Sequence, residues 1–148
     1  METTNALGCN LAAEVAGKFG RVRLCVSGTS MAPAIHPGDL ISVERVSLAE
    51  VSPGEIVVFL REGRLIVHRV AAKSESRDEP FLVTRGDRMR RNDAPVTGPE
   101  LVGRVMHLER GRTRVSAPLR HTFAQQVFCR LLCFSDRATC LYLRLAAL

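Results

Sequence analysis

Between residues 21 and 116, short apolar runs alternate with turn-forming residues. Each run is rich in Val, Ile or Leu and is bounded by Gly, Pro or Asp, which is typical of β-strands separated by turns. The predicted strands are 21–27, 39–46, 55–62, 64–72, 81–87 and 100–110, with a further short strand at 112–116. The sequence REGR at 61–64 predicts a hairpin between two of them. The polar stretches 73–80 and 88–99 are expected to be loops.

The N-terminal region has helical rather than strand spacing. Leu11, Val15 and Phe19 recur at intervals of four residues, which predicts one short helix over residues 8–19. Together with the strands, this helix predicts a mainly β (α+β) fold built from antiparallel sheets.

The C-terminal region, residues 119–148, returns to helical spacing. Arg130, Arg137 and Arg144 recur every seven residues and form a polar stripe on an otherwise apolar pattern. Two interpretations stay open for this amphipathic helical segment. It covers an apolar surface of the sheet, or it lies on a membrane surface as a peripheral contact. We therefore divide the chain into a domain at 1–118 and a helical segment at 119–148.

Length and charge narrow the function classes. The chain has 148 residues, which suits one domain with a modest core. Its net charge is +6, and 19 of its 21 basic residues are arginines, since only Lys18 and Lys73 are lysines. The arginines are scattered and aromatic residues are few, so we expect no nucleic-acid partner.

The cysteine pattern argues against a metal centre. Five cysteines form no Cys-x-x-Cys pair, and they lie at Cys9, Cys25, Cys129, Cys133 and Cys140. Structural zinc sites usually need two closely spaced pairs of ligands. We therefore expect reduced thiols in a reducing compartment, with no metal and no cofactor.

Targeting signals are not evident in the printed chain. The stretch LAAEVAGKFGRVRLCV is interrupted by charged residues, so it lacks the apolar core of a secretory signal. No apolar run approaches the length of about 18 residues that a membrane span requires. The expected location is cytoplasmic. The alternative is peripheral association with a membrane through residues 119–148.

The stretch GTSMAPAIHPGD places Ser30 in a proline-rich turn, where a serine nucleophile would need a base. The chain has four histidines, at 36, 68, 107 and 121. His68 lies in the apolar run LIVHRV, where partial desolvation favours the neutral imidazole that acts as a base. His36 is close to Ser30 in sequence, but we interpret it as a turn residue.

Two aspartates are candidates for the group that orients the base. Asp87 and Asp93 lie in TRGDRMRRNDAP, after a predicted strand. Either carboxylate can accept a hydrogen bond from an imidazole N–H and thereby select its tautomer. Both residues are also common in ordinary loops, so the choice between them stays open.

The ordered motifs resemble one family. SGTSMAP with PGD, then GEIVVF, VHRV, TRGD and VGRV resemble the type I signal peptidase family in that order, over about residues 24–106. LexA-type repressor proteases share the fold that this resemblance implies. Common bacterial members carry a lysine as general base where this chain has His68. The sequence is therefore similar to the Ser-His variant of archaeal and endoplasmic-reticulum signal peptidases.

The resemblance implies a role for each matching residue. Ser30 is the expected nucleophile, His68 the base and Asp93 the functional acid, while Asp87 is a supporting or alternative acid. Met31 and Pro33 are expected to shape the loop, Met31 by packing beneath the nucleophile and Pro33 by stiffening the turn.

The oxyanion of an acyl-transfer reaction needs hydrogen-bond donors. The backbone N–H of Ser30 is the expected donor. Some family members add a serine hydroxyl two positions before the nucleophile, but Gly28 occupies that position here. Thr29 and Ser27 are the neighbouring hydroxyls.

The expected function is a serine endopeptidase that cleaves a peptide or preprotein after small residues through an acyl-enzyme. Family members generally carry a membrane anchor, which the sequence pattern does not show. Two alternatives therefore stay open, a non-catalytic module on the same fold that binds peptides or serves assembly, and a self-cleaving regulator. The sequence does not predict the oligomeric state.

Overall fold

The computed structural model describes residues 2–74 and 79–116. Its elements are α1 (Glu2–Phe19), β1 (Arg21–Cys25), β2 (Leu40–Glu44), the 3-10 helix η1 (Leu48–Glu50), β3 (Ile56–Arg61), β4 (Arg64–Lys73), β5 (Leu82–Arg85), β6 (Leu101–Arg110) and β7 (Thr113–Ser116). The predicted helical segment at 119–148 lies outside the described residues.

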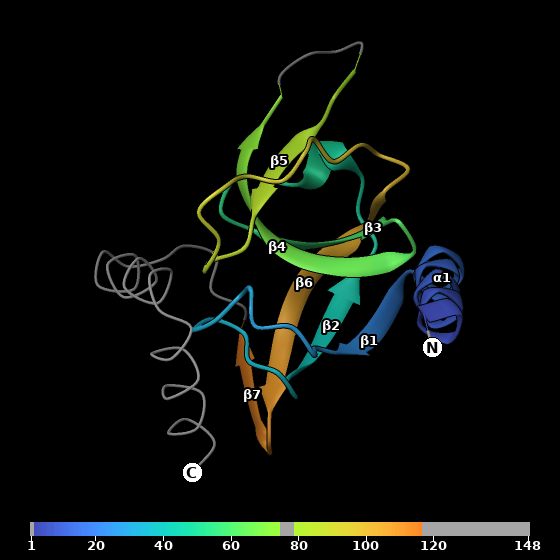
Figure 1. Cartoon of the computed structure of the whole chain (residues 1–148), viewed down its shortest axis with the longest axis vertical. Helices are drawn as coiled ribbons and strands as arrows, with labels where there is room; N and C mark the ends of the chain where they lie inside the picture. Colours follow the sequence, from blue (N-terminus) through green and yellow to red (C-terminus); the bar gives the residue numbers. More distant parts are fainter. Residues whose placement is uncertain (1, 75–78, 117–148) are drawn as a thin grey trace.

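All seven strands join one antiparallel sheet. The strand order is β1-β2-β6-β3-β4-β5, and β7 pairs with β6. Strand β6 is central, because its first half pairs with β3 and its second half with β2 and β7 (Figure 1). The prediction of a mainly β fold with antiparallel strands and a helix at the N-terminus is confirmed.

The β3–β4 hairpin has the longest uninterrupted run of paired residues in the sheet, and His68 lies within it. It extends from the Ile56–Arg69 pair to the Arg61–Arg64 pair. The two turn residues, Glu62 and Gly63, both have positive φ, at 51° and 70°. This is the turn type whose twist matches two adjacent strands, and it confirms the hairpin predicted at 61–64.

Strand β3 is buried on both faces and separates two apolar clusters. Ile56 and Val58 belong to the first cluster, which also contains residues of the segment 26–39 and of β2 and β6. Val57 and Phe59 belong to the second, which also contains residues of β4, β5 and η1 and of its flanks. Two-sided burial explains why this strand is continuously apolar instead of alternating.

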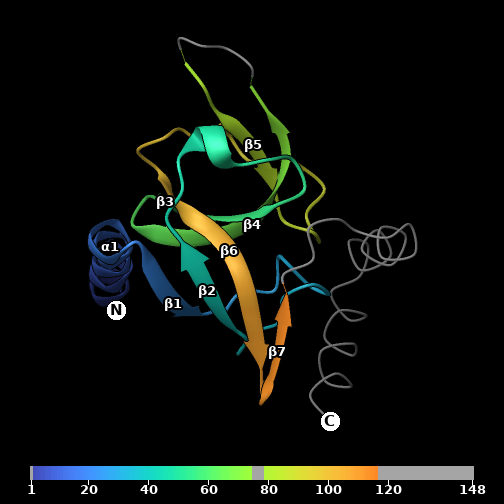
Figure 2. The ribbon, with the colours of Figure 1, turned by 180° about the vertical axis from the view of Figure 1, so that it is seen from behind.

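Helix α1 lies beside β1 at one edge of the molecule (Figures 1 and 2). It begins at Glu2, six residues before the predicted start. Its fully buried residue is Ala16, whereas Leu11 and Phe19, which we used to predict the helix, are mostly exposed. The helical period was therefore correct, but the face that it indicated is not the buried one.

Three local features differ from the sequence prediction. Strand β5 ends at Arg85, so the Gly-Asp pair that follows belongs to a turn. The 3-10 helix η1 was not predicted, although Ser47 and Glu50 have the spacing of a capping box, and the backbone N–H of Ser47 donates to Glu50 Oε2 at 2.8 Å. Within the predicted loop 88–99, Val96 forms a β-bridge with Leu82.

Candidate functional site

Ser30 lies in a loop that we call the Ser30 loop, residues 26–39, between β1 and β2. Backbone hydrogen bonds close its base, from Val26 N to Asp39 O at 2.9 Å and from Gly38 N to Val26 O at 2.7 Å. Because its two ends are tied together, the loop has a defined path despite its irregular backbone.

Buried residues hold the centre of the Ser30 loop. The Met31 side chain is 1% exposed and belongs to the first apolar cluster. Pro33 follows a cis peptide bond, and Ile35 N donates to Met31 O at 3.0 Å. Ser30 itself is only partly buried. Met31 is therefore packed in the interior, whereas its neighbour Ser30 keeps part of its surface exposed.

His68 is presented by β4, opposite Val57 of β3. Its ring lies at the edge of the second apolar cluster, where it meets the Phe59 ring nearly edge-on, with 6.2 Å between ring centroids. The His68 side chain is 9% exposed. A rigid central hairpin therefore sets the position of this imidazole.

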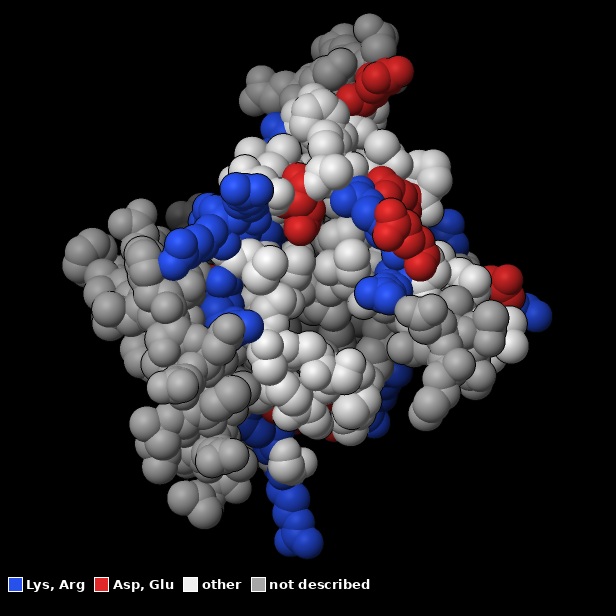
Figure 3. Space-filling view, in the orientation of Figure 1, with Lys and Arg blue, Asp and Glu red and all other residues white. Residues whose placement is uncertain are grey.

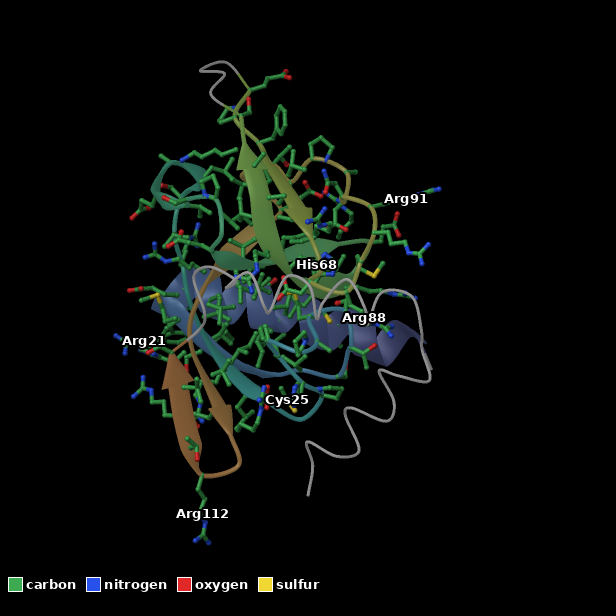
Figure 4. The ribbon with its side chains drawn as sticks, turned by 90° about the vertical axis from the view of Figure 1, so that its left-hand side faces the viewer. Arg21, Cys25, His68, Arg88, Arg91 and Arg112 are labelled. Carbon is green, nitrogen blue, oxygen red and sulfur yellow. The ribbon has the colours of Figure 1, made fainter. Side chains whose placement is uncertain are left out.

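The two ring nitrogens of His68 contact two candidate residues. Nε2 lies 3.1 Å from Ser30 Oγ, and Nδ1 lies 2.6 Å from Asp93 Oδ2. Figure 4 shows His68 at the centre of the molecule, next to the segment that follows β5. The three residues predicted from the motifs are therefore adjacent, although 38 and 25 residues of sequence separate them from His68.

Thr84 fixes the carboxylate of Asp93. The Thr84 hydroxyl donates to the same Asp93 Oδ2 at 2.6 Å, and the Asp93 backbone N–H donates to Thr84 O at 2.8 Å. Thr84 is fully buried on β5. This pair of hydrogen bonds orients the carboxylate toward the imidazole, much as outer residues orient the ligands of a metal site.

Asp87 has a different partner from Asp93. Its two carboxylate oxygens accept hydrogen bonds from Arg69 Nε and Nη2 at 2.8 and 2.9 Å. Arg69 also donates to Gly54 O at 2.9 Å. This ion pair is almost completely buried, and Arg69 follows His68 directly on β4. Asp87 thus ties the segment after β5 to the strand that carries the imidazole.

Gly86 is in close contact with both Ser30 and His68. A Cβ atom on residue 86 would lie 2.9 Å from His68 Nε2 and 2.9 Å from Ser30 O. The backbone N–H of Arg88 donates to Ser30 O at 2.9 Å. The turn after β5 therefore contacts the Ser30 loop through its backbone, and only glycine fits at its start.

His36 belongs to a separate polar cluster at the base of the Ser30 loop. Its backbone N–H donates to Asp39 Oδ2 at 2.8 Å, and Arg110 Nε and Nη2 donate to the Asp39 carboxylate at 2.9 and 2.7 Å. Burial lowers the pKa of His36, and the nearby Arg110 guanidinium lowers it further. Burial alone would raise the pKa of Asp39, but the hydrogen bonds from Arg110 and the His36 backbone hold it below its usual value.

The remaining candidates lie away from Ser30 or outside the described residues. His107 is on β6 opposite Ser42, and His121 lies in the part of the chain that is not described. Lys73 donates to the carbonyls of Ala49 and Val51, beside η1.

Two of the cysteines and one α-helix fall in the described part of the chain. Cys9 and Cys25 are free thiols, and the other three cysteines lie outside the described residues. Within residues 2–74 and 79–116, no helix is both long enough and apolar enough to cross a membrane.

The backbone N–H of Ser30 is the donor that the sequence predicts for an oxyanion. In the described part of the chain, no other residue accepts a hydrogen bond from the Ser30 backbone N–H. Gly28 is exposed, and nothing lies within 4 Å of the position that a Cβ atom would take there. Thr29 is partly buried and accepts a hydrogen bond from Ala32 N through its carbonyl.

This arrangement can activate a hydroxyl. When the Asp93 carboxylate accepts the hydrogen bond from Nδ1–H, the imidazole is held in the tautomer that leaves a lone pair on Nε2. That lone pair faces Ser30 Oγ at 3.1 Å, within the range for a general base and its nucleophile.

Three residues that hold the site together belong to the sequence motifs, but the sequence predicted no role for them. Thr84 and Gly86 belong to TRGD, and Arg69 belongs to VHRV. A glycine directly before an acid, at the end of a strand, was a usable signal for a close backbone approach. The buried pairing of Arg69 was not accessible from sequence, because it depends on the relative positions of β4 and the turn after β5.

Comparisons with known proteins agree with the motif resemblance. A family model described as Peptidase S24-like matches residues 13–106. The signal peptidase complex catalytic subunit sec11 of Neurospora crassa is 46% identical over 61 residues, which are 39% of this chain and 36% of that protein. The corresponding SEC11 subunit of Clavispora lusitaniae is 38% identical over 76 residues, 49% of this chain and 44% of that protein. The chain thus spans less than half the length of these curated relatives, and the predicted relationship to signal peptidases is confirmed.

Proposed function

Since this chain belongs to the Peptidase S24-like family, we propose that it is a serine endopeptidase with Ser30 as nucleophile, His68 as general base and Asp93 as orienting acid. One observation supports this assignment above the others. The contacts from Ser30 Oγ to His68 Nε2 and from His68 Nδ1 to Asp93 Oδ2 form a continuous chain at 3.1 and 2.6 Å.

In the first half-reaction, Ser30 Oγ attacks the carbonyl carbon of the scissile bond while its proton moves to His68 Nε2. The Asp93 carboxylate stabilises the imidazolium that forms. The Ser30 backbone N–H donates to the oxyanion of the tetrahedral intermediate. Collapse of this intermediate breaks the C–N bond, and the leaving amine takes the proton from His68.

In the second half-reaction, a water molecule replaces the amine. His68 Nε2 accepts a proton from this water, whose oxygen attacks the ester carbonyl of the acyl-enzyme. The ester C–O bond breaks and Ser30 Oγ regains the proton. The carboxylic acid product then leaves, and the histidine returns to its neutral state.

The proposed substrate is a peptide or preprotein with a small residue before the scissile bond. The small residue is implied by the motif resemblance, and the names of the curated relatives describe catalytic subunits of signal peptidase complexes.

The decisive experiment combines probe labelling with peptide cleavage. A fluorophosphonate probe should label the wild type at Ser30, as read by peptide mass spectrometry. Ser30→Ala should lose both labelling and cleavage of peptides with small residues, with a decrease in kcat of at least about 1,000-fold. Ser27→Ala is the matched control, because Ser27 is an exposed serine of the same loop and should keep both.

Two outcomes would replace the proposal. A folded wild type that neither reacts with the probe nor cleaves any peptide of this class would favour a non-catalytic binding or assembly module. Cleavage confined to the chain itself, and abolished by Ser30→Ala, would favour a self-cleaving regulator.

A further inference from the structure

A basic segment borders the candidate site. Residues 88–91 have the sequence Arg-Met-Arg-Arg and lie between Asp87 and Asp93. We call these four residues the basic segment. Figure 3 shows a group of basic side chains over the part of the molecule that follows β5 in Figure 1. The segment is thus part of the same turn region that contacts Ser30 and His68.

The outer residues of the basic segment are open to solvent. Met89, Arg90 and Arg91 are exposed, and Arg88 is partly buried. In residues 2–74 and 79–116, no hydrogen bond or ion pair engages the Arg91 side chain. Arg88 and Arg90 have other interactions within the protein, so Arg91 is the principal candidate for binding an external group.

The basic segment is held next to the reacting atoms at both ends. At one end Arg88 N donates to Ser30 O at 2.9 Å. At the other end, Arg91 is two residues before Asp93, whose carboxylate contacts His68. An extended peptide advances about 3.3 Å per residue. A peptide bound at Ser30 therefore brings residues two to four positions from its scissile bond near the basic segment.

The acids of this region are engaged elsewhere. Asp87 pairs with the Arg69 guanidinium, and Asp93 contacts His68 and Thr84. Neither aspartate forms an ion pair with Arg91, whose side chain has no ion pair in the described chain. An additional carboxylate from a bound peptide would meet a positive charge on a planar group that can donate two parallel hydrogen bonds.

We propose that the substrate carries an aspartate or glutamate within about four residues of the scissile bond and that Arg91, assisted by Arg90, binds this carboxylate. The inference rests on the proposed function, because it assumes that a peptide reaches Ser30. An acidic peptide is favoured over an anionic membrane because the basic segment is tied by its backbone to the nucleophile and the acid, so its ligand is a chain that occupies the site. Figure 4 shows Arg88 and Arg91 on the same side of the molecule, with Arg91 projecting outward from the segment that follows β5. In the same view Arg112 lies at the tip of the β6–β7 hairpin, far from this segment.

The test measures peptide binding to the full-length Ser30→Ala protein by fluorescence anisotropy. Each acidic peptide is paired with an isosteric one, Asp against Asn or Glu against Gln, placed two to four residues on either side of a small residue. The acidic peptide should bind about 5- to 20-fold more tightly at low salt. This preference should decrease in 0.5 M salt, because exposed charges are screened.

Charge-neutral variants assign the preference to the segment. Arg91→Gln, alone and combined with Arg90→Gln, should reduce the acidic preference to less than about 2-fold. Arg112→Gln is the matched control, since it removes the same charge from an exposed and remote position and should leave the preference unchanged. In Arg91→Glu the preference should reverse toward peptides with lysine at the same position. Equal affinity for the paired peptides at every position would overturn the inference.

Two further measurements separate the competing explanations. Vesicles of phosphatidylcholine with and without phosphatidylglycerol test the membrane alternative, and Arg91-dependent vesicle binding without peptide discrimination would overturn the inference. Hydrolysis by the wild type is measured separately. A preference for acidic peptides without hydrolysis would support the acidic ligand and contradict the proposed function. Hydrolysis without any preference for acidic peptides would support the proposed function and overturn the acidic ligand.

Discussion

Gly86 lies against His68 so closely that no side chain fits between them. A Cβ atom on residue 86 would be 2.9 Å from His68 Nε2, the nitrogen that faces Ser30 Oγ, and 2.8 Å from Met89 Cγ. Contacts below 3.0 Å are essentially never made by a Cβ atom. The distance between His68 Nε2 and Ser30 Oγ therefore depends on a residue that has no side chain of its own.

Gly86→Ala should reduce catalysis more than stability. The added methyl group must displace the imidazole or the Ser30 carbonyl, and a displacement of about 1 Å can cost about 100-fold in rate. We expect kcat for peptide cleavage to fall by about that factor with a smaller change in KM. Gly98→Ala is the control, because its Cβ would make an ordinary contact of 3.7 Å with Leu48. A Gly86→Ala enzyme with wild-type kcat would contradict the positioning role.

Asp93 and Asp87 should respond differently to the same substitution. Asp93→Asn removes the charge that holds Nδ1–H and stabilises the imidazolium, so kcat should fall by about 100- to 10,000-fold. Asp87→Asn instead disrupts a buried ion pair with Arg69 and should lower the free energy of unfolding by about 3 kcal/mol. Steady-state kinetics and urea unfolding of both variants measure the contrast. A catalytic loss in folded Asp87→Asn equal to that of Asp93→Asn would show that we assigned the acids wrongly.

Thr84 should matter through the carboxylate that it orients. Thr84→Val keeps the shape of the buried side chain and removes the hydroxyl that donates to Asp93 Oδ2 at 2.6 Å. We expect kcat to fall by about 10- to 100-fold, the usual cost of losing such an orienting hydrogen bond. Thr84→Ser should restore most of the activity. If Thr84→Val and Thr84→Ser lose equal activity, the hydroxyl is not the cause.

Gly28→Ser should increase the rate if an oxyanion donor is missing. The position is exposed and has no neighbour within 4 Å of the added Cβ, so the backbone can accept serine. A hydroxyl directed at the oxyanion can contribute up to about 100-fold in kcat, and we expect a gain of at least about 3-fold. Gly8→Ser, at an equally open position on α1, should have no effect. An unchanged kcat would show that the hydroxyl does not reach the oxyanion.

Acidification should destabilise the Ser30 loop in two steps. Since the folded pKa of His36 is lowered below 6.5, mainly by burial, its contribution to stability is complete above pH 6.5 and decreases as the pH falls toward the folded value. The lowered pKa of Asp39 makes its contribution complete above pH 3.8, and this contribution is lost as the pH falls through the folded value.

Urea unfolding between pH 8 and pH 5 measures the first of these steps. His36→Gln should reduce the slope of unfolding free energy against pH below 6.5, by at most about 1.4 kcal/mol per pH unit for this single group. The reference is the wild type under the same conditions. A slope that is identical in the two proteins would rule out His36 as the titrating group.

Sequence by itself determined the strand pattern and the identities of the candidate residues. The apolar runs predicted all seven strands and the β3–β4 hairpin, because a strand needs only local periodicity and turn residues at its ends. The order of the motifs identified the family and selected Ser30, His68 and Asp93. Local pattern failed at α1, where Ala16 rather than Leu11 or Phe19 is buried, because the buried face depends on how the helix packs beside β1.

Tertiary structure gave each of the two acids its partner. As loop carboxylates Asp87 and Asp93 were alike, and only the motif resemblance favoured Asp93, whereas the path of the chain after β5 directs Asp87 to Arg69 and Asp93 to His68. The same folding brings Thr84 and Gly86 against the site. Hydrogen bonds and steric contacts act over about 3 Å, whereas the partners are separated by as many as 56 residues, as Gly86 is from Ser30. Only the packed sheet brings such distant positions together.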